Sequence, residues 1–136
     1  AKVARSVALP DPQLFIYGDD GLYTLGLAQQ KNKLVFHPAV RFEHDCGTFE
    51  PGTVQTFTPL WKVYYYHRNL MFLYREAAGW LFWPMLCLIL PKWFLKGRNH
   101  KGSRSVFFRL LRHAIWDGFR NDRTISHDAV VELSKP

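Results

Sequence analysis

The sequence predicts an α/β fold that is mostly helical, in which a small helix and a two-strand unit precede three further helices. Three observations predict it. A helical pattern follows the acid pair at residues 19–20, two short β-prone runs come next, and from residue 59 onward apolar residues recur at helical spacing. The chain has 136 residues, of which 48% are hydrophobic, so it is long enough for about one domain with a core.

The first predicted unit covers residues 1–58. Within it, residues 19–31 (DDGLYTLGLAQQK) predict a helix, because apolar residues recur at helical spacing and two acids stand at its start. The next run, KLVFHPAVRFEH, predicts two short strands, residues 34–37 and 40–43, broken at Pro38. This helix and strand pair make up the α/β part of the expected fold.

The second predicted unit, residues 59–121, is helical. Residues 59–78 show an aromatic-rich helical pattern and residues 106–120 a basic amphipathic one, and such stripes are typical either of a protein core or of a membrane surface. We assign residues 122–136 to a carboxyl-terminal tail. In the amphipathic pattern one stripe holds Phe107, Leu111 and Ala114, and the opposite side holds Arg109, Arg112, His113 and Arg120.

Between these two patterns lies a segment of sixteen residues, 80–95 (WLFWPMLCLILPKWFL), whose only charge is Lys92. It is shorter than the roughly 20 residues that a helix needs to cross a bilayer, and Pro84 and Pro91 should disrupt it. We therefore expect a segment that lies in the membrane interface or re-enters it, with a buried core helix as the alternative. The side chains expected at the headgroups are Trp80, Trp83, Trp93 and Phe94, and those expected to meet anionic lipid are Lys92, Lys96, Arg98 and Lys101.

Positive charge is concentrated in the second part of the chain. Residues 1–60 carry five Lys/Arg and six Asp/Glu, a net charge of −1, whereas residues 61–136 carry thirteen and five, a net charge of +8. This predicts an anionic partner: a phosphate group, an acidic lipid surface or nucleic acid. Cys46 and Cys87 lie far apart without a CxxC pair, so the sequence indicates reduced thiols rather than a disulfide framework or a zinc knuckle.

Two adjacent acids, Asp19 and Asp20, end the apolar run LFIYG. Like charges side by side are typical of a helix start or of a site that holds a proton or a metal. His44 closes the predicted strand pair, and a returning strand would bring its imidazole toward the same end of the unit as Asp20. Together they could share a proton, a metal or a substrate, although a packed core histidine is the alternative.

The run LPDPQLFIYGDDGLYTLGLAQQKNKLVFHPAVRFEHD, followed by YYYHRN, resembles the carboxyl-terminal part of family 2 glycosyltransferases of the GT-A fold. The likeness is greatest to rhamnosyl- and galactofuranosyltransferase-like members. GDD at 18–20, a histidine at 44 and YYHRN at 65–69 stand in the family's order. The similarity covers residues 5–78 in detail and residues 79–121 in character only.

The resemblance implies a role for each matching residue. The second acid of the motif is the catalytic base of these inverting enzymes, and a neighbouring carboxylate can raise its pKa toward useful basicity. A divalent metal, Mg²⁺ or Mn²⁺, neutralises the pyrophosphate leaving group of the nucleotide-sugar donor. The implied assignments are Asp20 as base, Asp19, Tyr17, Arg68 and Asn69 as substrate-binding residues, and His44 as a metal ligand.

The sequence also departs from the family pattern. Leu22 and Gly26 stand where members often have an acid and an arginine, which puts acceptor contacts or helix support in doubt. The family's donor-binding half and its Asp-x-Asp metal motif should precede this segment, and the chain contains no Asp-x-Asp. We therefore expect a carboxyl-terminal portion that supplies the base, one metal ligand, part of the acceptor site and the membrane attachment.

Further expectations follow from this assignment. The resemblance implies a nucleotide-sugar donor, a glycan or lipid-linked acceptor, and a role in cell-surface polysaccharide synthesis at the cytoplasmic face of a bacterial plasma membrane. By itself the portion should bind no metal, transfer no sugar and self-associate through exposed apolar surface. The alternative is a basic, aromatic-rich module for membrane or nucleic acid without chemistry. Nucleic acid is the weaker branch, because the aromatic residues form continuous apolar runs instead of alternating with basic ones.

Overall fold

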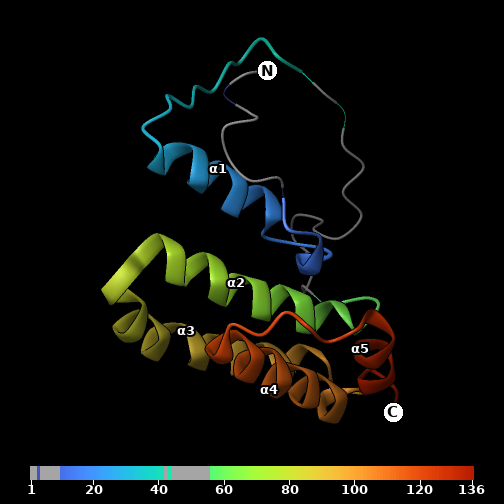
Figure 1. Cartoon of the computed structure of the whole chain (residues 1–136). Coiled ribbons are helices and arrows are strands. Elements are labelled where there is room, and N and C mark those ends of the chain that lie inside the picture. The colour runs from blue at the N-terminus through green and yellow to red at the C-terminus, as the bar shows by residue number, and fades with distance from the viewer. Residues whose placement is uncertain (1–2, 4–9, 42, 44–55) are drawn as a thin grey trace.

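The computed structural model describes residues 3, 10–41, 43 and 56–136, and the regular elements in these ranges are helices (Figure 1). Five are α-helices: α1 (Asp19–Gln29), α2 (Lys62–Ala78), α3 (Phe82–Lys96), α4 (Arg104–Arg120) and α5 (His127–Leu133). Three are short 3-10 helices: η2 (Pro12–Leu14), η3 (Gly79–Leu81) and η4 (Gly97–Asn99).

The predicted α/β class is wrong for the part of the chain that the structure describes, because residues 34–37, 40, 41 and 43 form no strand. A two-stranded hairpin is marginal on its own, and Pro38 lacks an N–H for a ladder. The described ranges hold no further strand to pair with this run. Its apolar side chains are accordingly left in solvent, with Phe36 at 89% exposure.

The four helices that the sequence predicts are confirmed as α1 to α4. Asp19 and Asp20 occupy the first turn of α1, where free N–H groups favour negative charge. The expectation that prolines disrupt residues 80–95 is wrong. Pro84 falls in the first turn of α3, where the N–H groups have no partner within the helix, and Pro91 lies inside a helix that continues to Lys96.

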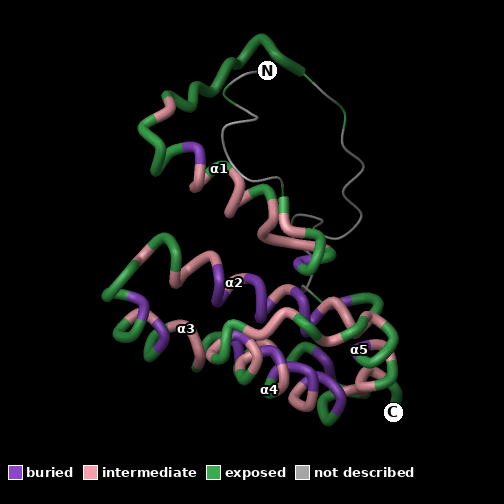
Figure 2. The backbone as a smooth tube through the Cα atoms, in the orientation of Figure 1, coloured by how far each residue is buried: buried purple, intermediate pink, exposed green. Residues whose placement is uncertain are grey.

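The core forms where α2 packs along α4, the most extensive contact between any two elements (Figure 2). Close approach depends on Gly118 of α4, since a Cβ there would come within 2.6 Å of the Met71 sulfur on α2. For α2 and α4 the core interpretation of the apolar stripes is therefore confirmed. Buried residues in this core include Val63, Tyr64, Tyr65 and Met71 of α2, Phe82, Leu86 and Trp93 of α3, and Phe107, Leu110, Leu111 and Ala114 of α4.

The carboxyl-terminal tail contains α5, which the sequence analysis missed. Ser126 caps this helix by accepting a hydrogen bond from the Ala129 N–H, and Val130 is fully buried. Arg109 of α4 donates from Nε to the Leu133 carbonyl oxygen (2.9 Å). The cap and the apolar run after it are a readable helix signal, and the tail is part of the packed structure.

Helix α3 packs one side against the core and exposes the other. Its outer side and the preceding turn carry large apolar residues, of which Trp80 is 80% and Leu88 70% exposed. Among the described residues, Lys62–Asn99 is the one helical stretch long and apolar enough to cross a membrane, by length and composition alone, and little of its most apolar part is buried. Core helices of water-soluble proteins pass the same test, so the exposure of α3 is the more informative observation.

Candidate functional site

The candidate site is the start of α1 together with the backbone that leads into it. Phe15 and Tyr17 have positive φ angles (63° and 67°), which non-glycine residues seldom adopt, and Gly18 follows at 82°. The Ile16 N–H donates to the Leu14 carbonyl oxygen (2.7 Å) across Phe15, which closes a γ-turn of the rarer, strained kind. Strain of this sort persists only where the surrounding structure holds it, and it clusters at functional sites.

Asn69 of α2 holds this strained segment. Its Nδ2 donates to the carbonyl oxygens of Leu14 (2.8 Å), Ile16 (2.8 Å) and Tyr17 (2.9 Å). The Asn69 side chain is fully buried, and a Cβ added to Gly18 would lie 3.4 Å from its Cβ. One side-chain amide thus satisfies three backbone carbonyls in the turn before the acid pair.

Arg68 adds a second set of hydrogen bonds to the same segment. Its Nε donates to Asn69 Oδ1 (2.9 Å) and its Nη2 to the Gln13 carbonyl oxygen (2.8 Å). The guanidinium is fully buried and lies 5.1 Å from the centre of the Tyr64 ring and 5.6 Å from that of Phe72. Aromatic faces offset part of the cost of burying a cation. We call Arg68 and Asn69 with their bonds to residues 13–17 the Arg68–Asn69 clamp.

Helix α4 supports the clamp through Tyr64. The Tyr64 hydroxyl donates to Asp117 Oδ2 (2.7 Å) and lies 3.5 Å from Arg68 Nη1. Burial, followed by the hydrogen bond to Asp117, raises the pKa of Tyr64 well above its ordinary value. The Tyr64 hydroxyl thus links the Asp117 carboxylate to the buried Arg68 guanidinium.

Helix α5 supports the strained segment from the other side. The His127 ring stacks on Phe15 with centroids 4.4 Å apart, and its Nδ1 lies 3.2 Å from the Tyr65 hydroxyl. Sequence reasoning missed Asp117 and His127. A signal existed for Asp117, which is the first acid after forty residues without one, whereas nothing in the sequence pattern pointed to His127.

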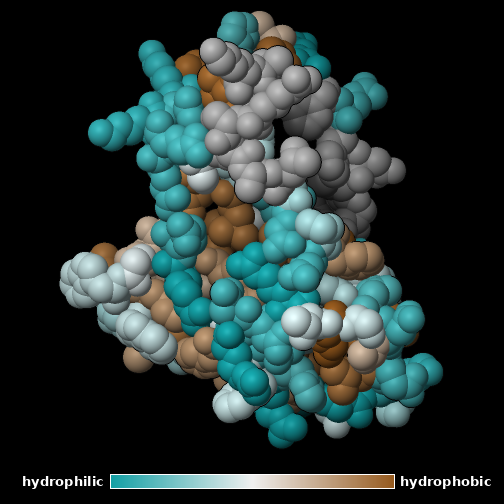
Figure 3. Space-filling model, viewed as in Figure 1, coloured by the Kyte–Doolittle hydropathy of each residue, from teal (hydrophilic) through white to brown (hydrophobic). Residues whose placement is uncertain are grey.

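The two acids of the motif lie in different surroundings. Asp20 is exposed, and its Oδ1 accepts a hydrogen bond from the Gly21 N–H (2.7 Å). Asp19 is half-buried and lines a cavity of about 260 Å³ between α1 and α2, where Leu22 and Gly26 form part of the wall. Both positions at which the sequence departs from the family pattern therefore face this cavity. Figure 3 shows hydrophobic surface at the gap between the two helices.

An ion pair closes the cavity next to Asp19. Arg123 binds the Asp11 carboxylate, and its guanidinium lies 4.7 Å from the centre of the Phe72 ring. Burial alone would raise the pKa of Asp11, but the Gln13 N–H and Arg123 outweigh it and hold that pKa below its usual value. The cavity wall therefore carries one cation, Arg123, and the carboxylates of Asp11, Asp19 and Glu76.

The structure brings together five of the six predicted site residues. Tyr17 and the two acids lie on the strained segment and the start of α1, and Arg68 and Asn69 bind that segment from α2. The Tyr17 hydroxyl is buried without a hydrogen-bond partner among the described residues, and burial raises its pKa. Arg68 and Asn69 are fully buried and position backbone, so substrate contact by either stays a prediction.

The metal assignment lies outside what the structure describes. His44 belongs to residues 44–55, which are not among the described ranges. In the part of the chain that is described, no three His, Cys, Asp or Glu side chains gather to hold a metal ion. A role for His44 in metal binding therefore stays a prediction.

Comparison with known proteins adds no relative. No family model matches the chain, and no curated protein or solved structure matches it either. The likeness to family 2 glycosyltransferases thus rests on the ordered motifs of the sequence, and what the site can do is read from its own geometry.

Proposed function

We propose that this chain is the acceptor-side part of a membrane-associated inverting glycosyltransferase, in which Asp20 is the catalytic base. The observation that supports this most is the Arg68–Asn69 clamp. The two motifs that carry the family resemblance, GDD at 18–20 and YYHRN at 65–69, are far apart in sequence. Hydrogen bonds across 52 to 55 residues nevertheless join Arg68 and Asn69 to residues 13–17, the segment that leads directly into GDD.

The chemistry follows from the position of Asp20. Its carboxylate is exposed in the first turn of α1, where an acceptor hydroxyl can reach it. It takes the proton of an acceptor hydroxyl as that oxygen forms a bond to the anomeric carbon, while the bond from that carbon to the nucleotide diphosphate breaks. A single displacement of this kind inverts the configuration at the sugar. A divalent metal, with His44 as one ligand, would neutralise the diphosphate leaving group.

The clamp gives the base a fixed position. The accepting atom of a general base must come within about 2.6–3.2 Å of the oxygen that carries the proton, and a misplacement of about 1 Å can reduce the rate about 100-fold. The strained turn at Phe15 and Tyr17 aims the start of α1, and Asn69 keeps the turn from relaxing. We therefore assign Arg68 and Asn69 as positioning residues.

The test compares the two acids in the full-length transferase. Asp20→Asn keeps size and hydrogen bonding but removes basicity, so kcat should fall by about 100-fold or more while nucleotide-sugar binding stays unchanged. Asp19→Asn is the matched control and should mainly raise the KM for the acceptor. If Asp19→Asn removes transfer and Asp20→Asn leaves it intact, the base is wrongly assigned.

A second candidate function, a membrane-binding module without chemistry, is favoured by the exposed apolar side of α3. Trp83 and Leu88 are 61% and 70% exposed on a helix with only two charged residues. The two candidates differ in the role of α1. Two results together would support the membrane-binding module: the chain binds vesicles, and variants of Asp19 and Asp20 leave the glycans of the cell unchanged.

A further inference from the structure

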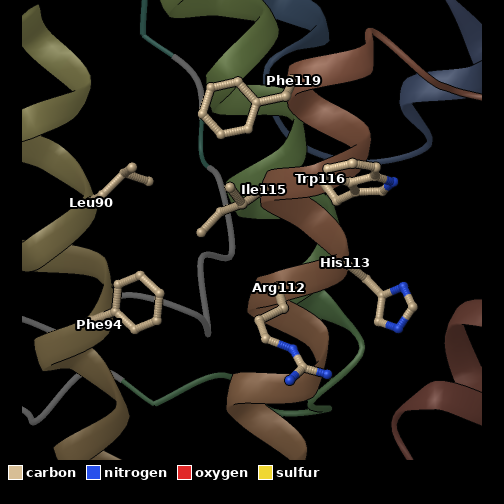
Figure 4. Close-up of a pocket in the computed structure, with 7 residues that line it drawn as sticks. All are labelled: Leu90, Phe94, Arg112, His113, Ile115, Trp116 and Phe119. Carbon is tan, nitrogen blue, oxygen red and sulfur yellow. The ribbon is translucent and has the colours of Figure 1, made fainter. Parts of the chain in front are cut away.

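A groove of about 600 Å³ runs between α3 and α4. Leu90 and Phe94 of α3 point across it toward Ile115 and Phe119 of α4, and Arg112 lies beside its Phe94 end (Figure 4). The volume is within the range of about 300–1,000 Å³ that is usual for small-molecule sites. Apolar side chains line nearly all of it, so water gains few hydrogen bonds there.

The segment that supplies every lining residue of the groove except Phe119 carries one sign of charge. Residues 77–116 contain seven Lys/Arg and no Asp/Glu. Arg112 is exposed, and within the described residues it forms no ion pair. A ligand that fits both features has an apolar chain and an anionic head.

We propose that this groove binds one acyl chain of an anionic phospholipid, whose phosphate contacts Arg112. A guanidinium pairs with phosphate through charge-assisted hydrogen bonds. The apolar walls of the groove would surround the acyl chain in place of neighbouring lipids. Phe94 lines the groove and is 44% exposed, so the α3 wall of the groove reaches the surface of the molecule. A lipid of the adjacent leaflet could enter without leaving the membrane.

The position of the groove separates this lipid from the candidate active site. Helix α1 packs on α2, and α3 and α4 pack on α2 from the other side (Figure 1). The groove therefore does not face Asp20, and its lipid is an anchor rather than an acceptor. Lipid binding here deepens the membrane association that we propose above and is independent of the role of Asp20, so either can fail alone.

The experiment titrates the whole chain with dihexanoylphosphatidylglycerol below its micelle concentration, and separately with dihexanoylphosphatidylcholine and with glycerol 3-phosphate. Calorimetry gives the stoichiometry. We expect one saturable site for the anionic lipid, about tenfold weaker binding of the zwitterionic lipid, and no binding of glycerol phosphate. Glycerol phosphate binding as tightly as the anionic lipid, or unsaturable partitioning, would overturn the proposal.

Matched variants locate the site. Leu90→Trp fills the groove and should weaken the anionic lipid at least tenfold, whereas Leu88→Trp makes the same change on the outer side of α3 and should not. Arg112→Gln should remove the preference for the anionic lipid, with Arg98→Gln as its control. Circular dichroism checks the fold of each. If Leu90→Trp fails to fold, the exposed Arg112 decides alone: an unchanged preference in Arg112→Gln contradicts the proposal.

Discussion

Helices α2 and α3 follow one another in the chain, and the more polar of the two is the more buried. In α2, His67, Arg68 and Asn69 are all fully buried. In α3 the only charged residues are Lys92 and Lys96, yet Leu88 is 70% exposed. Each helix thus departs from the usual pattern: α2 buries polar side chains, and α3 exposes apolar ones.

The difference has a physical reason in each helix. Most polar groups buried in α2 have partners: the clamp satisfies carbonyls of the strained segment, and His67 donates from Nδ1 to the Val63 carbonyl oxygen (2.7 Å), although its Nε2 has no partner among the described residues. Apolar side chains of α3 are exposed because no element among the described residues covers them. An exposed apolar surface of this kind is typical of a surface that meets lipid or another protein. Burial in α2 therefore serves the clamp, whereas the exposed side of α3 is the surface that we propose for membrane attachment.

The largest expected effect is on the clamp. Asn69→Ala removes three hydrogen bonds to backbone carbonyls and the acceptor of Arg68 Nε. The two amide hydrogens serve the three carbonyls, so with the Arg68 Nε bond about three full bonds are lost at about 1 kcal/mol each. The buried Arg68 Nε left without an acceptor adds about 1 kcal/mol, so the free energy of unfolding should fall by about 4 kcal/mol. Urea denaturation measures it, with the exposed Asn99→Ala as control, for which we expect a change within about 0.5 kcal/mol. Equal effects of the two variants would show that the clamp adds no stability.

The next effect separates the two sides of α3. Leu86 is 3% exposed and Leu88 is 70% exposed, so one helix offers the same substitution on both sides. Leu86→Ala should cost about 3 kcal/mol of unfolding free energy in water, and Leu88→Ala less than about 0.5 kcal/mol. Vesicle binding should reverse the order, with Leu88→Ala the more damaging. Comparable losses of stability would mean that the outer side of α3 packs within the protein.

A smaller effect concerns His67, whose pKa burial lowers from 6.5 to about 3, with added repulsion from Lys96 and His100. Below pH 6.5 His67 is protonated in the unfolded chain but stays neutral in the folded chain. The free energy of unfolding therefore decreases as the pH is lowered from 6.5 to about 3. At pH 5 the loss should be about 2 kcal/mol relative to neutral pH. His67→Gln, compared with the unaltered chain by urea denaturation across this window, should flatten the slope. An unchanged slope would assign the acid sensitivity to other groups.

Helices α1 to α4 could be predicted from the sequence, because each carries its own period, whereas the short helix α5 was missed. Residues 59–78 and 106–120 gave the right elements, and the family resemblance singled out the acids at 19–20. The strands at 34–37 and 40–43 could not be judged in this way, because a strand depends on neighbours that its own sequence does not contain.

The site was predicted as a set of residues but not as an arrangement. Arg68 and Asn69 were expected to contact substrate, and the structure buries them against backbone 55 residues earlier. No local pattern reports a contact at that separation. The same limit applies to Trp93. We expected its side chain at the lipid headgroups, and this prediction is wrong because Trp93 is only 4% exposed.

Two sides of the molecule also differ in their cations. Lys92, Arg98 and Lys101 are exposed near the end of α3, whereas Lys96 lies with its Nζ 4.7 Å from the centre of the Tyr66 ring. Three of the four basic residues expected to meet lipid are therefore free to do so. The chain offers a matched control set of three exposed basic residues in the segment that follows α1: Lys31, Lys33 and Arg41.

Co-sedimentation with vesicles tests most directly whether α3 faces lipid. The chain should sediment with anionic vesicles, lose binding as salt increases, and have Trp80 and Trp83 quenched by brominated acyl chains. Changing Lys92, Arg98 and Lys101 together to Gln should weaken binding about tenfold or more, and the same change in the control set should not. A chain that stays in the supernatant at every lipid charge, with its tryptophans unquenched, would contradict the assignment of α3 to the membrane.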